Sequence, residues 1–471
     1  MPTILGANSV SGYDVENSLR FNDGSTEKLT RTNSSGGNRQ IFTHSFWFKR
    51  ATPGNIDVLF QVGTSTSTNT GFYTVTINGS DKLFIGGAAS SYRQTDRLFR
   101  DPAAWYHIVL AMDTTDGTAD NRLKVYVNGS QETSFTTNNT ISQNLNTPVN
   151  ENSKVHQISG NQQANDYYAA GYLSEFNHID GQQLDPSYFG ETNDNGVWVP
   201  KKYTGTYGTN GFFLEFQQTG TSANSSGMGA DTSGNDNHYA ATNLAAIDVT
   251  TDTPTNNFAT WNPLDADLAA APTITEGNTQ LAQPQSGGST NCNFGVSQGK
   301  WYVEAKITDR SNIWLGIVPQ NLYPAGTDLF TKNYTIGIYA GNPNLYQNGS
   351  SQGSLGGGLS DDDIVMYAID LDNNLFYIGK NGQWNDGLGG GFDQSAFADA
   401  NGFSFNRSGT EFYVIGTVNG SGSSNYVVQM NFGNPAFSIS SSNNDGKYGN
   451  FEYAVPSGYY ALCTKRLAEF G

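Results

Sequence analysis

Short runs of alternating apolar and polar residues recur along most of the chain, and clusters of Gly, Asn, Ser, Thr and Asp separate them. Residues 300–307, Lys-Trp-Tyr-Val-Glu-Ala-Lys-Ile, show this pattern clearly. The alternation has the period of a β-strand with one buried face, and Gly, Asn and Asp favour the turns between strands. Aromatic residues make up 13% of the chain and charged residues only 14%, which suits sheets better than solvated helices. The sequence therefore predicts an all-β protein and excludes helix bundles and coiled coils.

The strand patterns fall into two blocks within the 471 residues, a length that suggests two or three domains of about 150 residues. Residues 221–288 between the blocks are rich in Asn and Thr but contain Phe258 and Trp261. Because a free linker rarely carries such rings, we predict an ordered, irregular connector, with disorder as the alternative. The predicted fold is two antiparallel β-sandwiches, residues 1–220 and 289–471, joined by this connector.

The net charge of −18 has no compensating basic cluster, so the chain would repel a phosphate backbone and nucleic acid is not expected as a partner. No stretch approaches the roughly 20 apolar residues that span a membrane. The first residues lack a basic region followed by an apolar one. We therefore expect no membrane insertion and no export signal.

Two cysteines, Cys292 and Cys463, lie near the two ends of the second block. They cannot form a disulfide framework or a CxxC zinc site. Two buried thiols are the favoured interpretation, and a disulfide between neighbouring first and last strands is the alternative.

Four segments of the first block, in order, form a recognisable series. They are residues 45–49 (Ser-Phe-Trp-Phe-Lys), 105–109 (Trp-Tyr-His-Ile-Val), 123–129 (Leu-Lys-Val-Tyr-Val-Asn-Gly) and 171–176 (Gly-Tyr-Leu-Ser-Glu-Phe), with Ile-Asp-Gly following at 179–181. The series resembles the strands of laminin-G-like, concanavalin-A-type jelly rolls. The resemblance covers about residues 1–220 and implies that fold there.

The second block contains the most specific motif of the chain, at residues 370–382 (Asp-Leu-Asp-Asn-Asn-Leu-Phe-Tyr-Ile-Gly-Lys-Asn-Gly). Together with residues 299–304 (Gly-Lys-Trp-Tyr-Val-Glu) and 314–317 (Trp-Leu-Gly-Ile), it resembles the SPRY family. This resemblance covers about residues 290–465 and implies a second concanavalin-like sandwich.

The order of jelly roll, Asn/Thr-rich connector and SPRY-like domain is similar to a group of virion structural proteins of tailed bacteriophages. Matching stretches include residues 196–201 (Gly-Val-Trp-Val-Pro-Lys) and 252–258 (Asp-Thr-Pro-Thr-Asn-Asn-Phe). The resemblance implies a protein of the virion, such as a tail fibre or other surface appendage that adheres to the host. Its implied partners are other virion proteins, copies of itself, and a host-surface glycan or protein. A capsid decoration or assembly protein and a glycan depolymerase are the alternatives.

No residue pattern indicates catalysis. Jelly-roll glycosidases need two carboxylates across a cleft, and the nearest candidates are Glu175 with Asp180, and Asp370 with Asp372. Both pairs fit turn chemistry better. The five histidines belong to no nucleophile motif, and we predict that the protein is not an enzyme.

Calcium is the one cofactor that the sequence suggests, because oxygen-rich loops suit a hard cation. One loop places Asp113, Asp116 and Asp120 close together in sequence, and residues 231–237 (Asp-Thr-Ser-Gly-Asn-Asp-Asn) form a second acidic turn. Neither loop matches an EF-hand, and solvated hairpin turns are the alternative.

Aromatic residues in predicted loops are the candidates for carbohydrate binding, since a sugar presents an apolar face and a rim of hydroxyl groups. The alternative is that each ring is a packed anchor of its loop. The candidates are Tyr92, Tyr167, Tyr168, Tyr323, Tyr346 and Trp384.

Overall fold

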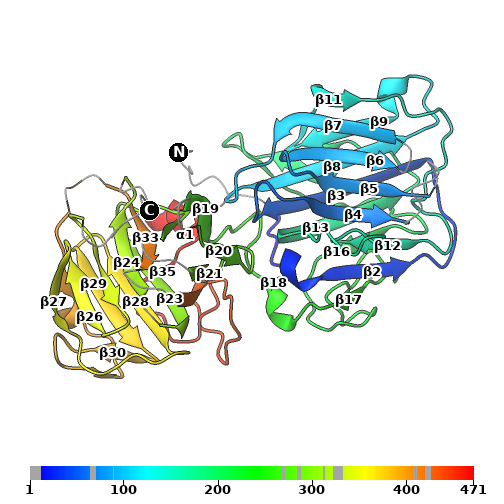
Figure 1. Cartoon of the computed structure of the whole chain (residues 1–471). Coiled ribbons are helices and arrows are strands. Elements are labelled where there is room, and N and C mark those ends of the chain that lie inside the picture. The colour runs from blue at the N-terminus through cyan, green and yellow to red at the C-terminus, as the bar shows by residue number, and fades with distance from the viewer. Residues whose placement is uncertain are drawn as a thin grey trace. The chain divides into compact units, whose positions relative to one another are not determined.

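The computed structural model describes residues 12–63, 71–87, 90–266, 271–283, 288–310, 313–321, 332–407, 409, 411–419 and 426–471. These residues confirm the predicted all-β fold, with α1 (Thr464–Phe470) as the one α-helix among them. Two compact units divide the chain, the first ending at Asn256 and the second running from Asn257 to Gly471 (Figure 1). No helix in the described ranges is long and apolar enough to cross a membrane.

Two eight-stranded sheets form the first unit, and their inner faces enclose one apolar core. The first sheet has the order β10 (Ser130–Gln131), β9 (Leu123–Val127), β8 (Trp105–Asp113), β3 (Ile41–Arg50), β13 (Gly171–Asp180), β1 (Ser18–Phe21) and β18 (Val249–Thr250), with β16 (Phe212–Leu214) beside β13. The second has the order β11 (Phe135–Asn138), β7 (Ser90–Leu98), β6 (Lys82–Gly87), β5 (Tyr73–Ile77), β4 (Asp57–Val62), β12 (Val155–Ile158), β2 (Lys28–Thr32) and β17 (Ala240–Thr242). Figure 1 shows the two sheets as facing layers.

The hairpin between β9 and β10 illustrates how the sequence specifies this fold. Asn128 and Gly129 both have positive φ angles, 47° and 78°, which match the tight turn that Asn-Gly predicts. Val127 consequently pairs with Ser130 in antiparallel register.

The outer face of the first sheet is covered by a chain segment that follows β13. This segment contains the small hairpin of β14 (Gly190–Thr192) and β15 (Trp198–Pro200). Its rings, including Phe189, Tyr203 and Tyr207, pack on Val109 and Ile179 of the sheet. The first unit therefore buries apolar side chains on both faces of this sheet.

The second unit also consists of two large sheets, of seven and ten strands, around one core. The seven-stranded sheet has the order β19 (Trp261–Ala266), β22 (Ser289–Cys292), β33 (Tyr413–Asn419), β24 (Ile313–Pro319), β25 (Ile336–Tyr339), β26 (Asn344–Gln347) and β27 (Ser350–Ser354). The ten-stranded sheet has the order β20 (Thr273–Thr275), β21 (Gln280–Gln283), β34 (Tyr426–Asn431), β23 (Lys300–Asp309), β28 (Ile364–Asp370), β29 (Leu375–Lys380), β30 (Gln383–Asn385) and β31 (Phe392–Gln394), with β32 (Phe403–Ser404) beside β29 and β35 (Tyr460–Ala461) parallel to β23.

The segment 221–288 differs from the predicted separate connector, because both units use it for their sheets. Strands β17 and β18 pair with β2 and β1 of the first unit. Strands β19 to β21 pair with β22 and β34 of the second unit. Phe258 and Trp261, the rings that suggested order, are fully buried in the second unit. The boundary therefore lies between Asn256 and Asn257.

Cys292 and Cys463 are both buried, free thiols. Burial raises the pKa of Cys292 to about 12, so this thiol is protonated and inert at neutral pH. The structure thus agrees with the interpretation of two buried thiols rather than with the disulfide.

Candidate functional site

The loop between β12 and β13, residues 159–170, concentrates unusual backbone conformations at one place on the first unit. Positive φ angles occur at Ser159 (67°), Gly160 (85°), Asn165 (57°) and Tyr167 (53°). A bulky residue in this left-handed region is strained by about 1–2 kcal/mol. Tyr167 therefore adopts a conformation that its own side chain disfavours.

Hydrogen bonds to the start of β4 hold this loop in place. The carbonyl oxygen of Tyr167 accepts from the amide of Val58 at 3.0 Å, and the amide of Gly160 donates to the carbonyl oxygen of Val58 at 3.0 Å. The Asp57 carboxylate accepts from the amide of Ala170 at 3.0 Å. The loop is thus fixed on both sides of Tyr167.

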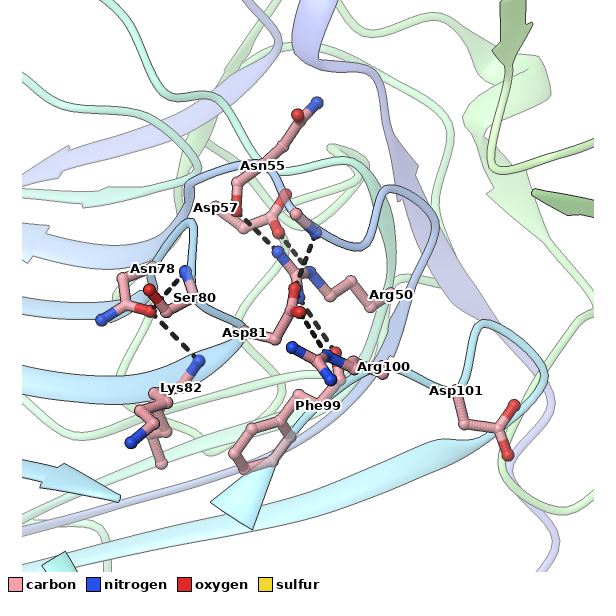
Figure 2. A network of polar contacts seen from close by, with 12 residues as sticks. Arg50, Asn55, Asp57, Asn78, Ser80, Asp81, Lys82, Phe99, Arg100 and Asp101 are labelled. Carbon is pink, nitrogen blue, oxygen red and sulfur yellow. Dashed lines mark hydrogen bonds and ion pairs between the residues drawn. The ribbon is translucent and has the colours of Figure 1, made fainter. Parts of the chain in front are cut away.

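Asp57 is in turn fixed by a buried network of ion pairs, which Figure 2 shows. Arg50, at the end of β3, donates from Nε to Asp57 at 2.7 Å and from Nη1 to Asp81 at 2.6 Å. Arg100 donates to the other oxygen of Asp81 at 2.6 Å. Burial alone would raise the pKa of Asp81, but hydrogen bonds from Arg100, Gly54 and Arg50 outweigh burial and lower it. Both Arg50 and Asp57 are fully buried, so this network is a rigid base for the loop.

The ring of Tyr167 extends from this base into solvent, with 48% of the residue exposed. The neighbouring Tyr168 is buried, and its hydroxyl donates to Asn165 at 2.5 Å. Asn165 also accepts from Nζ of Lys28 at 3.3 Å. Nζ of Lys28 also lies 5.9 Å from the centroid of the Tyr168 ring. The loop thus carries an exposed ring at Tyr167, and the Asn165 amide two residues earlier is bound by Lys28 and Tyr168. Rings, amides and ammonium groups are the groups that stack on an apolar face and hydrogen-bond a polar rim.

The other aromatic candidates lie in different surroundings. Tyr92 and Trp384 are buried, like Tyr168, and so do not present the exposed ring that carbohydrate binding needs. Trp384 packs between Tyr302 and Phe397 on the outer face of the ten-stranded sheet. Tyr346 is half-buried on β26, and Tyr323 lies outside the described residues.

The predicted calcium ligands do not come together in the structure. Asp113 and Asp116 each accept a hydrogen bond from an amide two residues later, as Asx turns do. Asp120 is exposed and lies 3.9 Å from Arg93. The guanidinium of Arg122 donates to the carbonyl oxygens of Asp116, Gly117 and Ile141. A cationic side chain thus occupies the place where carbonyl ligands would meet an ion, and the loop does not fit calcium.

The second acidic turn, residues 231–237, is hydrogen-bonded to residues 209–213 of the first unit. Both carboxylate oxygens of Asp231 accept hydrogen bonds, from Phe213 and Ser233 on one side and from Ser233 and Asn237 on the other. The side-chain amide of Asn237 donates to the carbonyl oxygens of Thr209 and Gly211. Across the described ranges, no cluster of three His, Cys, Asp or Glu side chains has metal-binding geometry.

A Ser–His pair that the sequence did not suggest lies on the outer face of the first sheet. His107 is 2.9 Å from Oγ of Ser45, and its Nδ1 accepts a hydrogen bond from the indole of Trp198 at 2.9 Å. Because Nδ1 is an acceptor, Nε2 of the neutral ring carries the proton and donates to Ser45. A serine nucleophile needs the opposite arrangement, in which the imidazole accepts its proton. The pair is therefore structural.

The carboxylate pairs considered for catalysis also have structural partners. Asp180 accepts hydrogen bonds from the amides of Asn38 and Asn210. Asp370 binds Lys300 at 2.8 Å and the turn residue Asn373. Burial raises the pKa of Glu175 to about 8, and the hydroxyl of Tyr13 donates to its carboxyl group at 2.8 Å.

Comparison with known proteins finds a family model that matches part of the first unit. Residues 23–182 match the model described as the concanavalin A-like lectin/glucanases superfamily. No curated protein matches the chain.

Solved structures resemble parts of the chain at low identity. The SPRY domain of human HERC1 is 18% identical to the matched part of this chain. The match covers 36% of this chain and 96% of the HERC1 domain, with a TM-score of 0.27. A heptameric SAP-like pentraxin from Limulus polyphemus is 18% identical, with coverages of 37% and 80% and a TM-score of 0.27. A putative carbohydrate binding protein from Bacteroides ovatus ATCC 8483 is 12% identical, with coverages of 49% and 58% and a TM-score of 0.32. The family model, which matches residues 23–182, shows a laminin G-like, concanavalin A-like domain in the first unit.

Proposed function

We propose that this chain is a non-enzymatic binding protein of a bacteriophage particle. In this role it is a tail fibre or another surface appendage, and it contacts a glycan of the host surface through the loop that carries Tyr167. The concanavalin A-like lectin fold of the first unit supports a binding role. The virion location rests on the resemblance of the domain order and the sequence stretches described above.

The strained, exposed Tyr167 is the observation that carries the binding site. A ring that is 48% exposed contributes little to the core, yet the chain holds it at a φ of 53° on a loop fixed by buried ion pairs. Strain that persists without a packing benefit is typical of functional positions. A ligand that stacks on the ring supplies the missing benefit.

A glycan array of bacterial surface polysaccharides, probed with the full chain, tests this site. Tyr167→Asn removes the ring but keeps a residue that tolerates the left-handed backbone, and we expect it to weaken binding at least about tenfold. Tyr188→Ala is the matched control, because Tyr188 is also 48% exposed and has ordinary backbone angles in the 3-10 helix Pro186–Tyr188. Equal binding by both variants and the parent chain would contradict the proposal.

Immunogold electron microscopy of intact phage, with an antibody against the purified chain, tests the location. Label on the tail supports an adhesive appendage. Label over the head would replace this role by capsid decoration, and particles without label would contradict a virion protein.

A further inference from the structure

Three adjacent strands of the second unit each place one aromatic ring on the outer face of the seven-stranded sheet. Trp314 on β24 pairs in register with Tyr339 on β25, and their ring centroids are 5.2 Å apart. Tyr346 on β26 lies with its ring centroid 4.2 Å from that of Trp314. All three rings are half-buried. We call these three residues the ring platform.

The alternation of the strands fixes which face carries the platform. Leu315, Ile338 and Leu345, the neighbours of the three rings in sequence, are buried in the core. Because successive residues of a strand point to opposite faces, the three rings lie on the outer face of the sheet, where Trp314 also packs against buried residues of the core cluster. Gly337, the in-register partner of Tyr346, adds no side chain between the rings.

On the β26 and β27 side, the residues in register with the platform are neutral hydrogen-bonding groups. On the other sides lie Val418 of β33, the buried partner of Trp314, and Arg310, which donates to the carbonyl oxygen of Gly341 beside the Tyr339 ring at 3.4 Å. Asn344 pairs in register with Tyr339, and it pairs in turn with Ser354. Ser351 pairs with Tyr346. Both serines are exposed. The described residues in register with the three rings on β24 to β27 include no charged side chain.

Aromatic rings next to neutral amide and hydroxyl groups indicate which class of ligand the platform would bind. Aromatic faces attract the C–H face of a sugar ring, and amide and hydroxyl groups bind its hydroxyl rim without requiring a charge. An acidic glycan would find no cation among these in-register residues, because Arg310, the cation near Tyr339, is paired with Asp361 at 3.8 Å, and it would meet a chain with a net charge of −18. Sites on strands are also held more precisely than sites on loops.

We propose that the ring platform is a second carbohydrate site, specific for a neutral oligosaccharide and independent of the Tyr167 loop. The chain then binds glycans through both units. This inference goes beyond the proposed function, because it needs neither the virion location nor binding at Tyr167.

The test uses the full chain and three neutral probes, maltohexaose, cellohexaose and laminarihexaose, with binding measured by calorimetry and by tryptophan fluorescence. We expect at least one probe to bind and to change the tryptophan emission of the chain, and Trp314→Phe should abolish this change. Tyr346→Ala should weaken this binding about tenfold or more, whereas Tyr346→Phe, which keeps the ring, should remain within about threefold of the parent chain.

Two variants act as controls. Phe412→Ala removes a ring of the second unit that is 50% exposed outside the platform, and it should bind like the parent chain. Tyr167→Asn should also leave this binding unchanged, which separates the inference from the proposed function. Circular dichroism verifies that each variant is folded.

Three results would overturn the inference: no binding of any neutral probe, parental affinity in folded Tyr346→Ala, or binding only of an acidic probe such as oligogalacturonate. If Tyr167→Asn alone abolishes binding, the glycan site is on the first unit and the platform is not a site.

Discussion

The two units share a sandwich architecture but bury very different polar groups. All five histidines of the chain lie in the first unit, and both cysteines lie in the second. Four of the histidines are buried, namely His44, His107, His156 and His178. In the second unit, the buried carboxyl group of Glu304 accepts four hydrogen bonds.

Three of the histidines meet inside the first sandwich. His44 and His178 stack with their Nδ1 atoms 3.2 Å apart, and Nε2 of His178 lies 2.8 Å from Oδ1 of Asn150. His156 contacts Phe60, which also contacts His44. Burial lowers the pKa of His44 to about 3. Burial also lowers the pKa values of His156 and His178, and the positive charge of Arg31 lowers both of these further. These rings are neutral at pH 7.

Glu304 lies in the opposite situation. Its carboxyl group accepts hydrogen bonds from Tyr302, Asn431 and the amides of Glu452 and Tyr453. Burial raises its pKa even against these four donors. A group with a raised pKa favours the folded state at low pH, whereas a buried histidine with a lowered pKa favours it at high pH. The first unit also contains carboxyl groups with a raised pKa, at Glu175 and Asp57, so what distinguishes it is the set of buried neutral histidines, which oppose folding at low pH.

The largest expected effect is acid unfolding of the first unit ahead of the second. Unfolded histidines take up protons below a pH of about 6.5, while His44 and His107 remain neutral in the folded state down to about 3. Stability is therefore lost as the pH falls through this window, by about 1.4 kcal/mol per pH unit for each of these histidines. Calorimetry from pH 7 to pH 4, with pulsed hydrogen exchange to assign each transition, measures the loss. If the second unit unfolds at a higher pH than the first, the comparison between the units is wrong.

The next effect concerns the buried ion pairs. Arg50→Met leaves Asp57 and Asp81 without the guanidinium that both contact, and we expect the free energy of unfolding of the first unit to fall by about 3–5 kcal/mol. Lys300→Met in the second unit is the control, because Lys300 is 33% exposed beside Asp370 and should contribute about 1 kcal/mol or less. Urea denaturation of both variants measures the difference, and equal losses would refute the role of burial.

The smallest expected effect is the change in stability when a tyrosine is replaced by glycine, and its sign differs between the two units. Tyr167→Gly relieves the left-handed strain and should raise the stability of the first unit by about 1 kcal/mol. Tyr346→Gly places glycine in a regular strand and should lower the stability of the second unit by about 1 kcal/mol or more. Thermal unfolding of both variants measures these shifts. A destabilised Tyr167→Gly would show that the exposed ring packs usefully, and would weaken the case for a ligand there.

Much of the fold could be predicted from the sequence, because strand alternation and turn residues are local. The Asn128-Gly129 turn is one example, and the strand pattern at residues 300–307, which lies within β23 (Lys300–Asp309), is another. The division of residues 221–288 could not be predicted, since β17 and β18 are two or three residues long and their partners lie far away in the sequence. Pairing over such distances leaves no local pattern.

The candidate site was predicted only in part for a similar reason. Tyr167 was among the expected rings, but Tyr92 and Trp384 have the same loop-like sequence surroundings and are buried. Whether a segment from elsewhere covers a ring is a property of the tertiary fold. The positive φ of Tyr167 also has no sequence signature, because tyrosine is not a residue that turns favour. Trp314 and Tyr339 were missed as site residues, although the outward position of Trp314 between Ile313 and Leu315 is visible in the strand alternation.

The late pairing of β1 has a consequence for synthesis on the ribosome. Ser18 of β1 hydrogen-bonds with Thr250 of β18, 232 residues later in the chain. At about 5–20 residues per second, translation needs roughly 10–50 s to supply that partner. During this interval β1 has an open edge that invites pairing with other chains. The nascent first unit is therefore exposed to misassembly until almost its last residue has been made, and a pause in translation after Asn256 would protect it.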